Sequence, residues 1–265
     1  MLLNIFNRLK FFVSKINIIL RYKKSKISHI IKWIFFGKEI SNFVYEIENQ
    51  EEIIEIVNVI TGIKFEKLNA ILNEIDPKNE DFRSFFSEYY FKDFSNKIIF
   101  GRRMIWYLIV RVMKPAIVIE SGVERALGSG LLIYALYMNH KEDNNENEYI
   151  GIDIKEIKKS YFNFENKKYL NYKFNTNDSI DFIKNFNRKS KIVYISDAEH
   201  NYDFELKEFT EIQLKMLKGS VIISDNNSGA LSEFSRKHNK NMLIFKESPK
   251  NTWYNGATAS ISYFY

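Results

Sequence analysis

Two short runs of β-branched and apolar residues, 192–195 and 221–223, each lead to a serine that is followed at once by an aspartate. The two aspartates are Asp197 and Asp225. Between the runs, residues 204–217 have apolar side chains at helical spacing, with Glu and Lys on the other face. A strand, a crossover helix and a second strand form a βαβ unit, whose strands are parallel. The sequence therefore predicts that both aspartates meet at the carboxyl edge of one sheet, where open α/β folds bind ligands.

A second pattern of strand, turn and helix lies upstream. Residues 104–113 form an apolar helix, and the Lys-Pro pair after them ends it because proline cannot continue a helix. Residues 116–119 follow as a buried strand, with a glycine-bearing turn from 120 and a new apolar helix at 131–137. Glycine lets the backbone approach a ligand, and the helix N-terminus presents unpaired N–H groups. This pattern predicts a site of the nucleotide-binding type.

Two further acids follow the next predicted strands. Asp153 is near the end of a strand at 149–154, where an acid commonly bonds the ribose hydroxyls of an adenosyl cofactor. A capping or solvent-facing role is the alternative for Asp153. Asp178 follows a short strand at 172–174 and directly precedes a predicted helix, which its side chain can cap.

The composition sets the outer limits. At 265 residues and 45% hydrophobic content, the chain can bury one large core with a small accessory region. It has no cysteine, which excludes disulfides and thiolate metal sites and fits a reducing compartment. We therefore expect a cytoplasmic protein. The formal charge of +6 is concentrated at the N-terminus.

Residues 1–36 mix apolar side chains with Lys and Arg. They contain no apolar run of the roughly 18–20 residues that a spanning helix needs, and no small-residue cleavage site. Two interpretations stay open: peripheral anchoring on the inner face of a membrane, or a helical extension that packs on its own domain or on a second subunit of a homo-oligomer. Nucleic-acid binding is disfavoured because the basic residues interleave with an apolar face.

Helical patterns continue to residue 100, so we divide the chain into a helical N-terminal extension or cap (1–100) and an α/β domain (101–265). Two aromatic clusters are candidates for contact with an acceptor. They are residues 88–91 and the pair Trp253 and Tyr254, for which core packing and a surface turn are the alternatives.

The strand that ends in Glu-x-Gly, preceded by a helix and Lys-Pro, resembles motif I of class I S-adenosylmethionine (SAM)-dependent methyltransferases. The chain departs from that motif near Ala126, where a glycine is common. The resemblance implies an α/β fold with a Rossmann-like, mostly parallel seven-stranded sheet and an antiparallel C-terminal strand, preceded by a helical region. The residues that it implies for SAM binding are Glu120, Ser121, Gly122, Asp153, Asp178 and Ser179.

The segments SDAEHNYDFELKEF and MLKGSVIISDNNSG are similar to the acidic strand ends of metal-dependent catechol and caffeoyl-CoA O-methyltransferases. They also resemble bacterial methyltransferases of sugars and natural products, which have an Asp-x-x-His-x-Tyr segment. The resemblance extends from Lys114 to the C-terminus. It implies that Asp197, Asp225 and Asn226 hold a divalent cation, and oxygen ligands without cysteine suit Mg²⁺.

Coordination to such a cation would lower the pKa of an acceptor hydroxyl and orient it for attack on the methyl group. His200 follows the first expected ligand by three residues, where the catechol-type enzymes have a basic lysine. Histidine titrates at about 6.5, which suits a general base at neutral pH. Contact with the cofactor or with the backbone is the alternative for His200.

The expected function is therefore SAM-dependent O-methylation of a sugar or other small natural product, in bacterial glycan or natural-product biosynthesis. Asp197 and His200 are the expected catalytic residues, and the expected partner is a small-molecule or glycan acceptor. Two alternatives stay open: a metal-independent methyltransferase that works by proximity, and a scaffold that binds SAM or a nucleotide without catalysis.

Overall fold

The computed structural model describes residues 46–86, 100–124, 126–144, 146–157, 171–250 and 256–264, together with residues 6, 9 and 10. The aromatic clusters at 88–91 and at Trp253 and Tyr254 lie outside these residues, as does nearly all of the basic N-terminal segment. Among the described helices, none is both long and apolar enough to cross a membrane.

The described strands form one seven-stranded sheet in the order β3-β2-β1-β4-β5-β7-β6. Their bounds are β1 (Ile117–Ser121), β2 (Glu148–Asp153), β3 (Asn171–Thr176), β4 (Ile192–Ser196), β5 (Val221–Ser224), β6 (Asn241–Lys246) and β7 (Thr258–Tyr263). Strands β1 to β5 pair in parallel, whereas β7 runs antiparallel to both of its neighbours, β5 and β6. This is the sheet that the resemblance to class I methyltransferases implies, and the predicted fold is confirmed.

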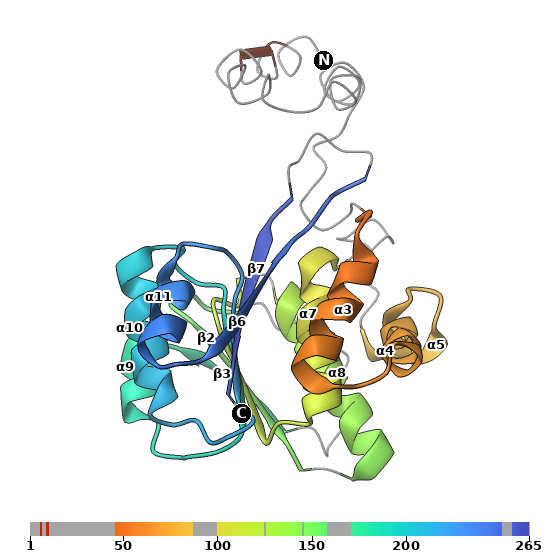
Figure 1. Ribbon diagram of the computed structural model, residues 1–265. Helices are drawn as coiled ribbons and strands as arrows, with labels where there is room; N and C mark the ends of the chain where they lie inside the picture. Colours follow the sequence, from red (N-terminus) through yellow and green to blue (C-terminus); the bar gives the residue numbers. More distant parts are fainter. Residues whose placement is uncertain are drawn as a thin grey trace.

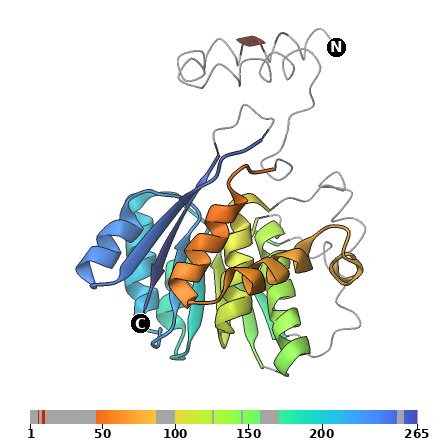
Figure 2. The same cartoon turned by 45° about the vertical axis from the view of Figure 1, so that its right-hand side comes forward.

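Helices cover both faces of the sheet (Figure 1). Their bounds are α3 (Gln50–Thr61), α4 (Phe65–Leu72), α5 (Glu80–Phe85), α7 (Met104–Met113), α8 (Leu127–Asp143), α9 (Ser179–Asn185), α10 (Tyr202–Gln213) and α11 (Ala230–Lys237), with short 3-10 turns η2 (Asn73–Ile75) and η3 (Gly101–Arg103). Helices α9, α10 and α11 lie on one face, and α3, α7 and α8 lie on the other, with α4 and α5 farther out (Figure 2).

The central strands are buried on both faces because their side chains alternate between two cores. On β4, Val193 and Ile195 pack into the core shared with α3, α7 and α8. Ile192 and Tyr194 face the opposite way, into the core with α10 and α11. The helices from the first 100 residues share the core of α7 and α8, so they cover one face of the sheet.

Local residues fix where the helices begin and end. Helix α7 has the predicted bounds, and Lys114, the residue that follows it, has a left-handed φ of 46°. Helix α10 begins two residues earlier than predicted because the Asn201 side chain accepts the N–H groups of Asp203 and Phe204. The start of α10 sets the length of the loop that follows β4, at the carboxyl edge of the sheet.

The chain reverses its direction of winding at β1, which lies between β2 and β4. In open α/β sheets such a switch point opens a crevice beyond the carboxyl ends of the strands. The register aligns Ser121 at the end of β1 with Ser196 of β4, and Ser196 with Ser224 of β5. The loops beyond these three serines therefore leave the sheet at one level.

Candidate functional site

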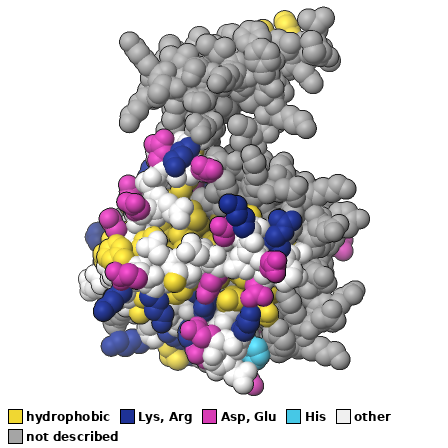
Figure 3. Space-filling model, turned by 90° about the vertical axis from the view of Figure 1, so that its right-hand side faces the viewer, with side chains coloured by type: hydrophobic (Ala, Val, Ile, Leu, Met, Phe, Trp, Pro, Cys, Tyr) yellow, Lys and Arg dark blue, Asp and Glu magenta, His cyan; other side chains and the backbone are white. Residues whose placement is uncertain are grey.

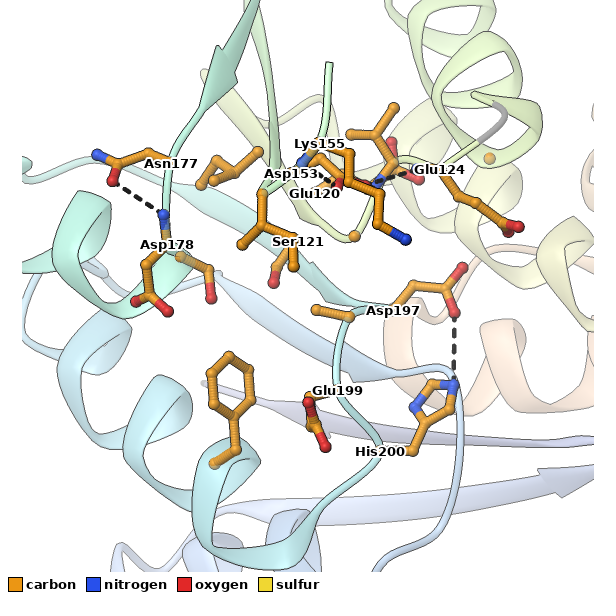
Figure 4. Close-up of a pocket in the computed structure, with 18 of the residues that line it drawn as sticks. Glu120, Ser121, Glu124, Asp153, Lys155, Asn177, Asp178, Asp197, Glu199 and His200 are labelled. Atoms are coloured by element: carbon orange, nitrogen blue, oxygen red, sulfur yellow. Dashed lines mark hydrogen bonds and ion pairs between the residues drawn. The ribbon is translucent and has the colours of Figure 1, made fainter. Parts of the chain in front are cut away.

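A cavity of about 670 Å³ lies beyond the carboxyl edge of the sheet (Figure 4). Its volume is in the range of roughly 300–1,000 Å³ that is usual for small-molecule sites. The end of β1 and the turn after it, the end of β2, and the loops after β2, β3 and β4 contribute to its wall. It brings together the predicted residues Glu120, Ser121, Gly122, Asp153, Asp178, Ser179, Asp197 and His200.

Gly122 lets the turn after β1 lie directly against the end of β4. Its φ is 85°, and a Cβ atom built on it would lie 2.3 Å from the backbone oxygen of Asp197. The N–H of Gly122 donates to the backbone oxygen of Ile152 at 2.9 Å, which also ties the turn to β2. No residue with a side chain fits here without moving the backbone, so the glycine is a steric requirement.

Asp153 fastens the same turn from the end of β2. Its Oδ2 accepts the N–H groups of Val123 at 3.0 Å and Glu124 at 2.8 Å, and its Oδ1 accepts the N–H of Lys155 at 2.8 Å. An ionised carboxylate has about four acceptor sites, so these three bonds leave capacity for a ligand hydroxyl. The ribose contact of Asp153 stays a prediction.

The departure from motif I at Ala126 has a visible consequence in the backbone. Ala126 has a φ of 58° and is buried, and Glu124 has a φ of 45°. Glycine visits this left-handed region without steric cost, whereas other L-residues pay roughly 1–2 kcal/mol. The turn therefore keeps the conformation that favours glycine at a position where this chain has alanine.

Glu120 is buried at the end of β1. Its Oε2 accepts hydrogen bonds from Ser129 Oγ at 2.5 Å and from the hydroxyl of Tyr149. Burial raises the pKa of Glu120 to about 7, although both hydroxyl donors act to lower it. Glu120 therefore changes its charge close to neutral pH, inside the wall of the cavity.

Asp178 and Ser179 line the cavity from the start of α9. Asp178 accepts the N–H of Asp181 at 3.1 Å, so it caps the helix. Ser179 Oγ donates to Glu208. Cofactor contact by these two residues stays a prediction.

Two buried glutamates on α10 bind the serines at the strand ends. Ser121 Oγ and Ser196 Oγ donate to the Glu208 carboxylate at 2.6 and 2.7 Å, and Ser224 Oγ donates to Glu205 at 3.1 Å. Burial raises the pKa of Glu208, while the serine hydroxyls act to lower it. The sequence pattern placed the glutamates of this helix on its outer face, which is wrong for these two. Their spacing of three residues, in line with buried Phe209 and Ile212, was the available signal.

Arg102 binds Asp225 through two hydrogen bonds. Its Nε lies 2.7 Å from Asp225 Oδ1, its Nη2 bonds Oδ2, and its Nη1 lies 3.3 Å from Glu247 Oε1. Burial acts to lower the pKa of Arg102, but the charge and hydrogen bonds of Asp225 together with the charge of Glu247 outweigh burial, and the pKa is raised. Conversely, burial acts to raise the pKa of Asp225, and Arg102 lowers it. Both groups are therefore ionised and paired.

Arg103 lies close to both Asp197, which follows β4, and Asp225, which follows β5. Its Nη2 lies 2.9 Å from Asp197 Oδ2 and 3.6 Å from Asp225 Oδ2. Its guanidinium carbon lies 5.0 Å from the centre of the Trp106 ring, a distance at which a cation–π contact holds it in place. Burial and the neighbouring charge of Asp225 raise the pKa of Asp197, against the opposing effect of Arg103.

The predicted metal site does not form from these residues. Both carboxylate oxygens of Asp225 bond Arg102, and Asp197 Oδ2 bonds Arg103. Asn226 donates through Nδ2 to Glu205 at 2.9 Å and accepts the Ser228 N–H through Oδ1 at 2.7 Å. Across the described residues, no three His, Cys, Asp or Glu side chains are grouped to hold a metal.

The donor set therefore does not fit a divalent cation, because guanidinium groups already bond both oxygens of Asp225 and Oδ2 of Asp197. Arg102 and Arg103 were not among the residues predicted from the sequence. Their only signal was a pair of basic residues directly before an apolar helix, and nothing in the sequence placed that pair at the strand ends.

His200 lies at the same end of the cavity. Its Nε2 is 3.9 Å from Asp197 Oδ1, and its Nδ1 is 4.0 Å from Glu205 Oε1. The side chain is 49% exposed, and the imidazole points toward Asp197 (Figure 4). The structure thus places His200 beside the predicted acid with one face open, and its role as a base stays a prediction.

No protein-family model matches the sequence, and no curated protein matches it. Among solved structures the chain is similar to the SAH-bound Podospora anserina methyltransferase PaMTH1, with 12% identity, coverage of 82% of this chain and 97% of that one, and a TM-score of 0.40. It is also similar to the O-methyltransferase TomG from Streptomyces achromogenes, with 11% identity, coverage of 82% and 98%, and a TM-score of 0.45. A Bacillus cereus O-methyltransferase in complex with SAH has 11% identity, coverage of 80% and 97%, and a TM-score of 0.44.

Proposed function

We propose that the protein is a SAM-dependent methyltransferase that methylates a hydroxyl group of a small molecule. One observation supports this most: the cavity lies at the switch point beside β1, with a glycine turn from β1 and an acid from β2 in its wall. Its size suits a small ligand, and the antiparallel β7 distinguishes the sheet from that of a nicotinamide dinucleotide-binding domain.

The two ends of the cavity have different chemistry. At the first, Gly122 allows close backbone approach, and Asp153 and Asp178 present carboxylates that suit ribose and adenine donors. Glu120 also lines the cavity. We assign this end to the cofactor. SAM has a methyl group bonded to a positively charged sulfur. An oxygen nucleophile can attack this methyl group and displace the sulfur as a thioether.

At the second end, Arg103, Asp197 and His200 converge, and we assign this end to the acceptor. His200 Nε2 would take the proton of the acceptor hydroxyl, and Asp197 would stabilise the imidazolium that results. The acceptor oxygen gains a methyl group and loses its proton, and SAM leaves as the neutral thioether. No residue of the set needs to form a covalent bond.

We propose a small-molecule or glycan acceptor and no nucleic acid. On the face that shows α3, α4 and α5, the described Lys and Arg side chains alternate with Asp and Glu (Figure 3). Nucleic-acid-binding proteins usually gather basic side chains into a stripe or patch. The charges of the described residues on this face are interspersed and form no such stripe.

A product assay tests the reaction class. The full-length protein is incubated with SAM and a panel of sugars, sugar nucleotides, phenols and diols, and products are analysed for the mass of one added methyl group. We expect a product methylated on oxygen. SAM binding without a product from any acceptor class would instead favour the non-catalytic scaffold.

A further inference from the structure

The aspartates that follow β4 and β5, Asp197 and Asp225, both lie close to an arginine side chain of the protein. Arg103 Nη2 lies between Asp197 Oδ2 at 2.9 Å and Asp225 Oδ2 at 3.6 Å. Arg102 binds the other side of Asp225 through its Nε and Nη2 atoms. Two carboxylates that converge on one positively charged atom form the arrangement that oxygen ligands adopt around a metal ion.

The charge of the pair matches that of the ion it would replace. Arginine stays ionised in proteins, so Arg102 and Arg103 together bring two positive charges, as one divalent cation would. Asp225 is only 2% exposed, and an unpaired carboxylate there would be costly. Glu247 accepts from the backbone N–H of Arg102 at 3.0 Å and pairs with its guanidinium, which fixes Arg102 from the side away from Asp225.

Arg103 differs from Arg102 in its position. It lines the cavity, whereas Arg102 does not. It is also held on two sides, by the Trp106 ring and by Asp197, so its charge is fixed in place before a ligand enters. A fixed donor aimed at an oxygen that becomes negative is an effective form of electrostatic stabilisation.

We propose that Arg102 and Arg103 are the permanent cation of this site: they occupy the place of a divalent metal, and Arg103 provides the positive charge that faces the reacting oxygen of the acceptor. The role toward the acceptor rests on the proposed function, whereas the exclusion of metal does not. A metal ion acts as a Lewis acid and lowers the pKa of a bound hydroxyl. The two arginines instead provide charged hydrogen-bond donors, which position the hydroxyl.

Binding of Mn²⁺ alone tests this. The full-length protein in metal-free buffer is titrated with Mn²⁺, and free Mn²⁺ is followed by electron paramagnetic resonance. We expect no bound ion in the wild type at millimolar Mn²⁺. Arg103→Met removes one charge from between the carboxylates, so we expect it to bind one Mn²⁺ at least roughly tenfold more tightly than the wild type. Arg103→Lys keeps a cation and should behave as the wild type.

Arg236→Met is the matched control, because Arg236 is exposed on α11 and pairs locally with Glu233. It should leave the Mn²⁺ titration unchanged. If Arg103→Met does not fold, Arg103→Gln, which keeps a hydrogen-bond donor without charge, takes its place. Mn²⁺ binding by the wild type that disappears in Asp225→Asn would overturn the proposal. A folded Arg103→Met or Arg103→Gln protein that does not bind Mn²⁺ would overturn it as well.

A parallel titration of the same samples with SAM separates the two proposals. Wild-type protein that binds both SAM and Mn²⁺ would contradict the proposal that Arg102 and Arg103 occupy the place of a metal. It would leave the methyltransferase assignment standing. Protein that binds neither SAM nor Mn²⁺ would contradict the methyltransferase assignment, and with it the role of Arg103 toward the acceptor, but would leave the exclusion of metal standing.

Discussion

Arg103 Nη2 lies 2.9 Å from Asp197 Oδ2, so a fixed positive charge and the first acidic strand end meet at one point of the cavity wall. Asp197 in turn lies 3.9 Å from His200 Nε2. The acid therefore connects a buried guanidinium on one side with a half-exposed imidazole on the other. This arrangement differs from a metal site in its chemistry, because the cation is part of the chain and cannot be removed by a chelator.

Arg102→Met should destabilise the protein strongly. Arg102 is buried between Asp225 and Glu247, and removal of one partner of a buried ion pair typically costs about 3–5 kcal/mol. Urea unfolding followed by circular dichroism measures the change in the free energy of unfolding. Arg236→Met, which removes an arginine that is 73% exposed, should change that free energy little. Similar losses for both variants would contradict the structural role of Arg102.

Gly122→Ala should abolish SAM binding, whereas Gly62→Ala should preserve it. Both glycines have a left-handed φ, 85° for Gly122 and 69° for Gly62, so each substitution costs roughly 1–2 kcal/mol of stability through the backbone. At Gly122 the new Cβ would lie 2.3 Å from the Asp197 backbone oxygen. At Gly62 the new Cβ would have no atom within 4 Å.

Equilibrium binding of SAM and thermal unfolding of both variants check this comparison. Equal SAM affinity in Gly122→Ala and the wild type would show that the turn after β1 does not shape the cofactor site.

Glu120→Gln should change how stability depends on pH. The pKa of Glu120 is raised from 4.5 to about 7 in the folded protein, chiefly by burial. A raised pKa means that the folded state binds the proton more tightly than the unfolded state. The stabilisation is therefore complete below pH 4.5 and is lost as the pH rises toward about 7.

The glutamine of this variant would keep an oxygen for Ser129 and Tyr149 but has no proton to release. Relative to the variant, the wild type without cofactor should thus lose a few kcal/mol between these pH values. Thermal unfolding of both proteins across the range measures the difference. Parallel stability curves would mean that Glu120 stays ionised in the fold.

His200→Gln should reduce the rate of methyl transfer and leave SAM affinity unchanged. A positioned general base contributes roughly 10²–10⁴-fold to a rate, and His200 lies at the end of the cavity that we assign to the acceptor. His238→Gln is the control, because His238 packs against Phe234 at the end of α11. Initial rates with the acceptor found in the product screen provide the measurement. An unchanged rate in His200→Gln would exclude His200 as the base and favour catalysis by proximity.

The fold could be predicted from the sequence because its signals are local. Buried strands such as residues 192–195 are continuous apolar runs, and the proline after Lys114 marks the end of α7. The end of each parallel strand then defines one edge, so the positions of Asp153, Asp197 and Asp225 follow from chain order. The glycine at 122 was also predicted, since its turn is contained within three residues.

The partners of the acidic strand ends could not be predicted in the same way. Arg102 and Asp225 are separated by 123 residues, and their contact depends on how α7 packs over the sheet. A carboxylate that follows a strand has the same sequence signature whether a metal or an arginine neutralises it. Asp197 and Asp225 therefore lie at the predicted edge, where the structure pairs them with arginine, and we propose that the arginines take the place of the predicted metal. Glu205 and Glu208 were missed because a helix can bury a polar residue where the sheet offers it hydroxyl partners.

Calorimetric titration of the full-length protein with SAM, in buffer that contains EDTA, tests the central claim most directly. We predict one bound SAM per chain, with the same affinity in EDTA and in Mg²⁺. We assign Gly122 and Asp153 of the cavity wall to the cofactor, and Arg102 and Arg103 already pair with the aspartates at the strand ends. Absence of binding at millimolar SAM, or binding that requires Mg²⁺, would contradict this prediction.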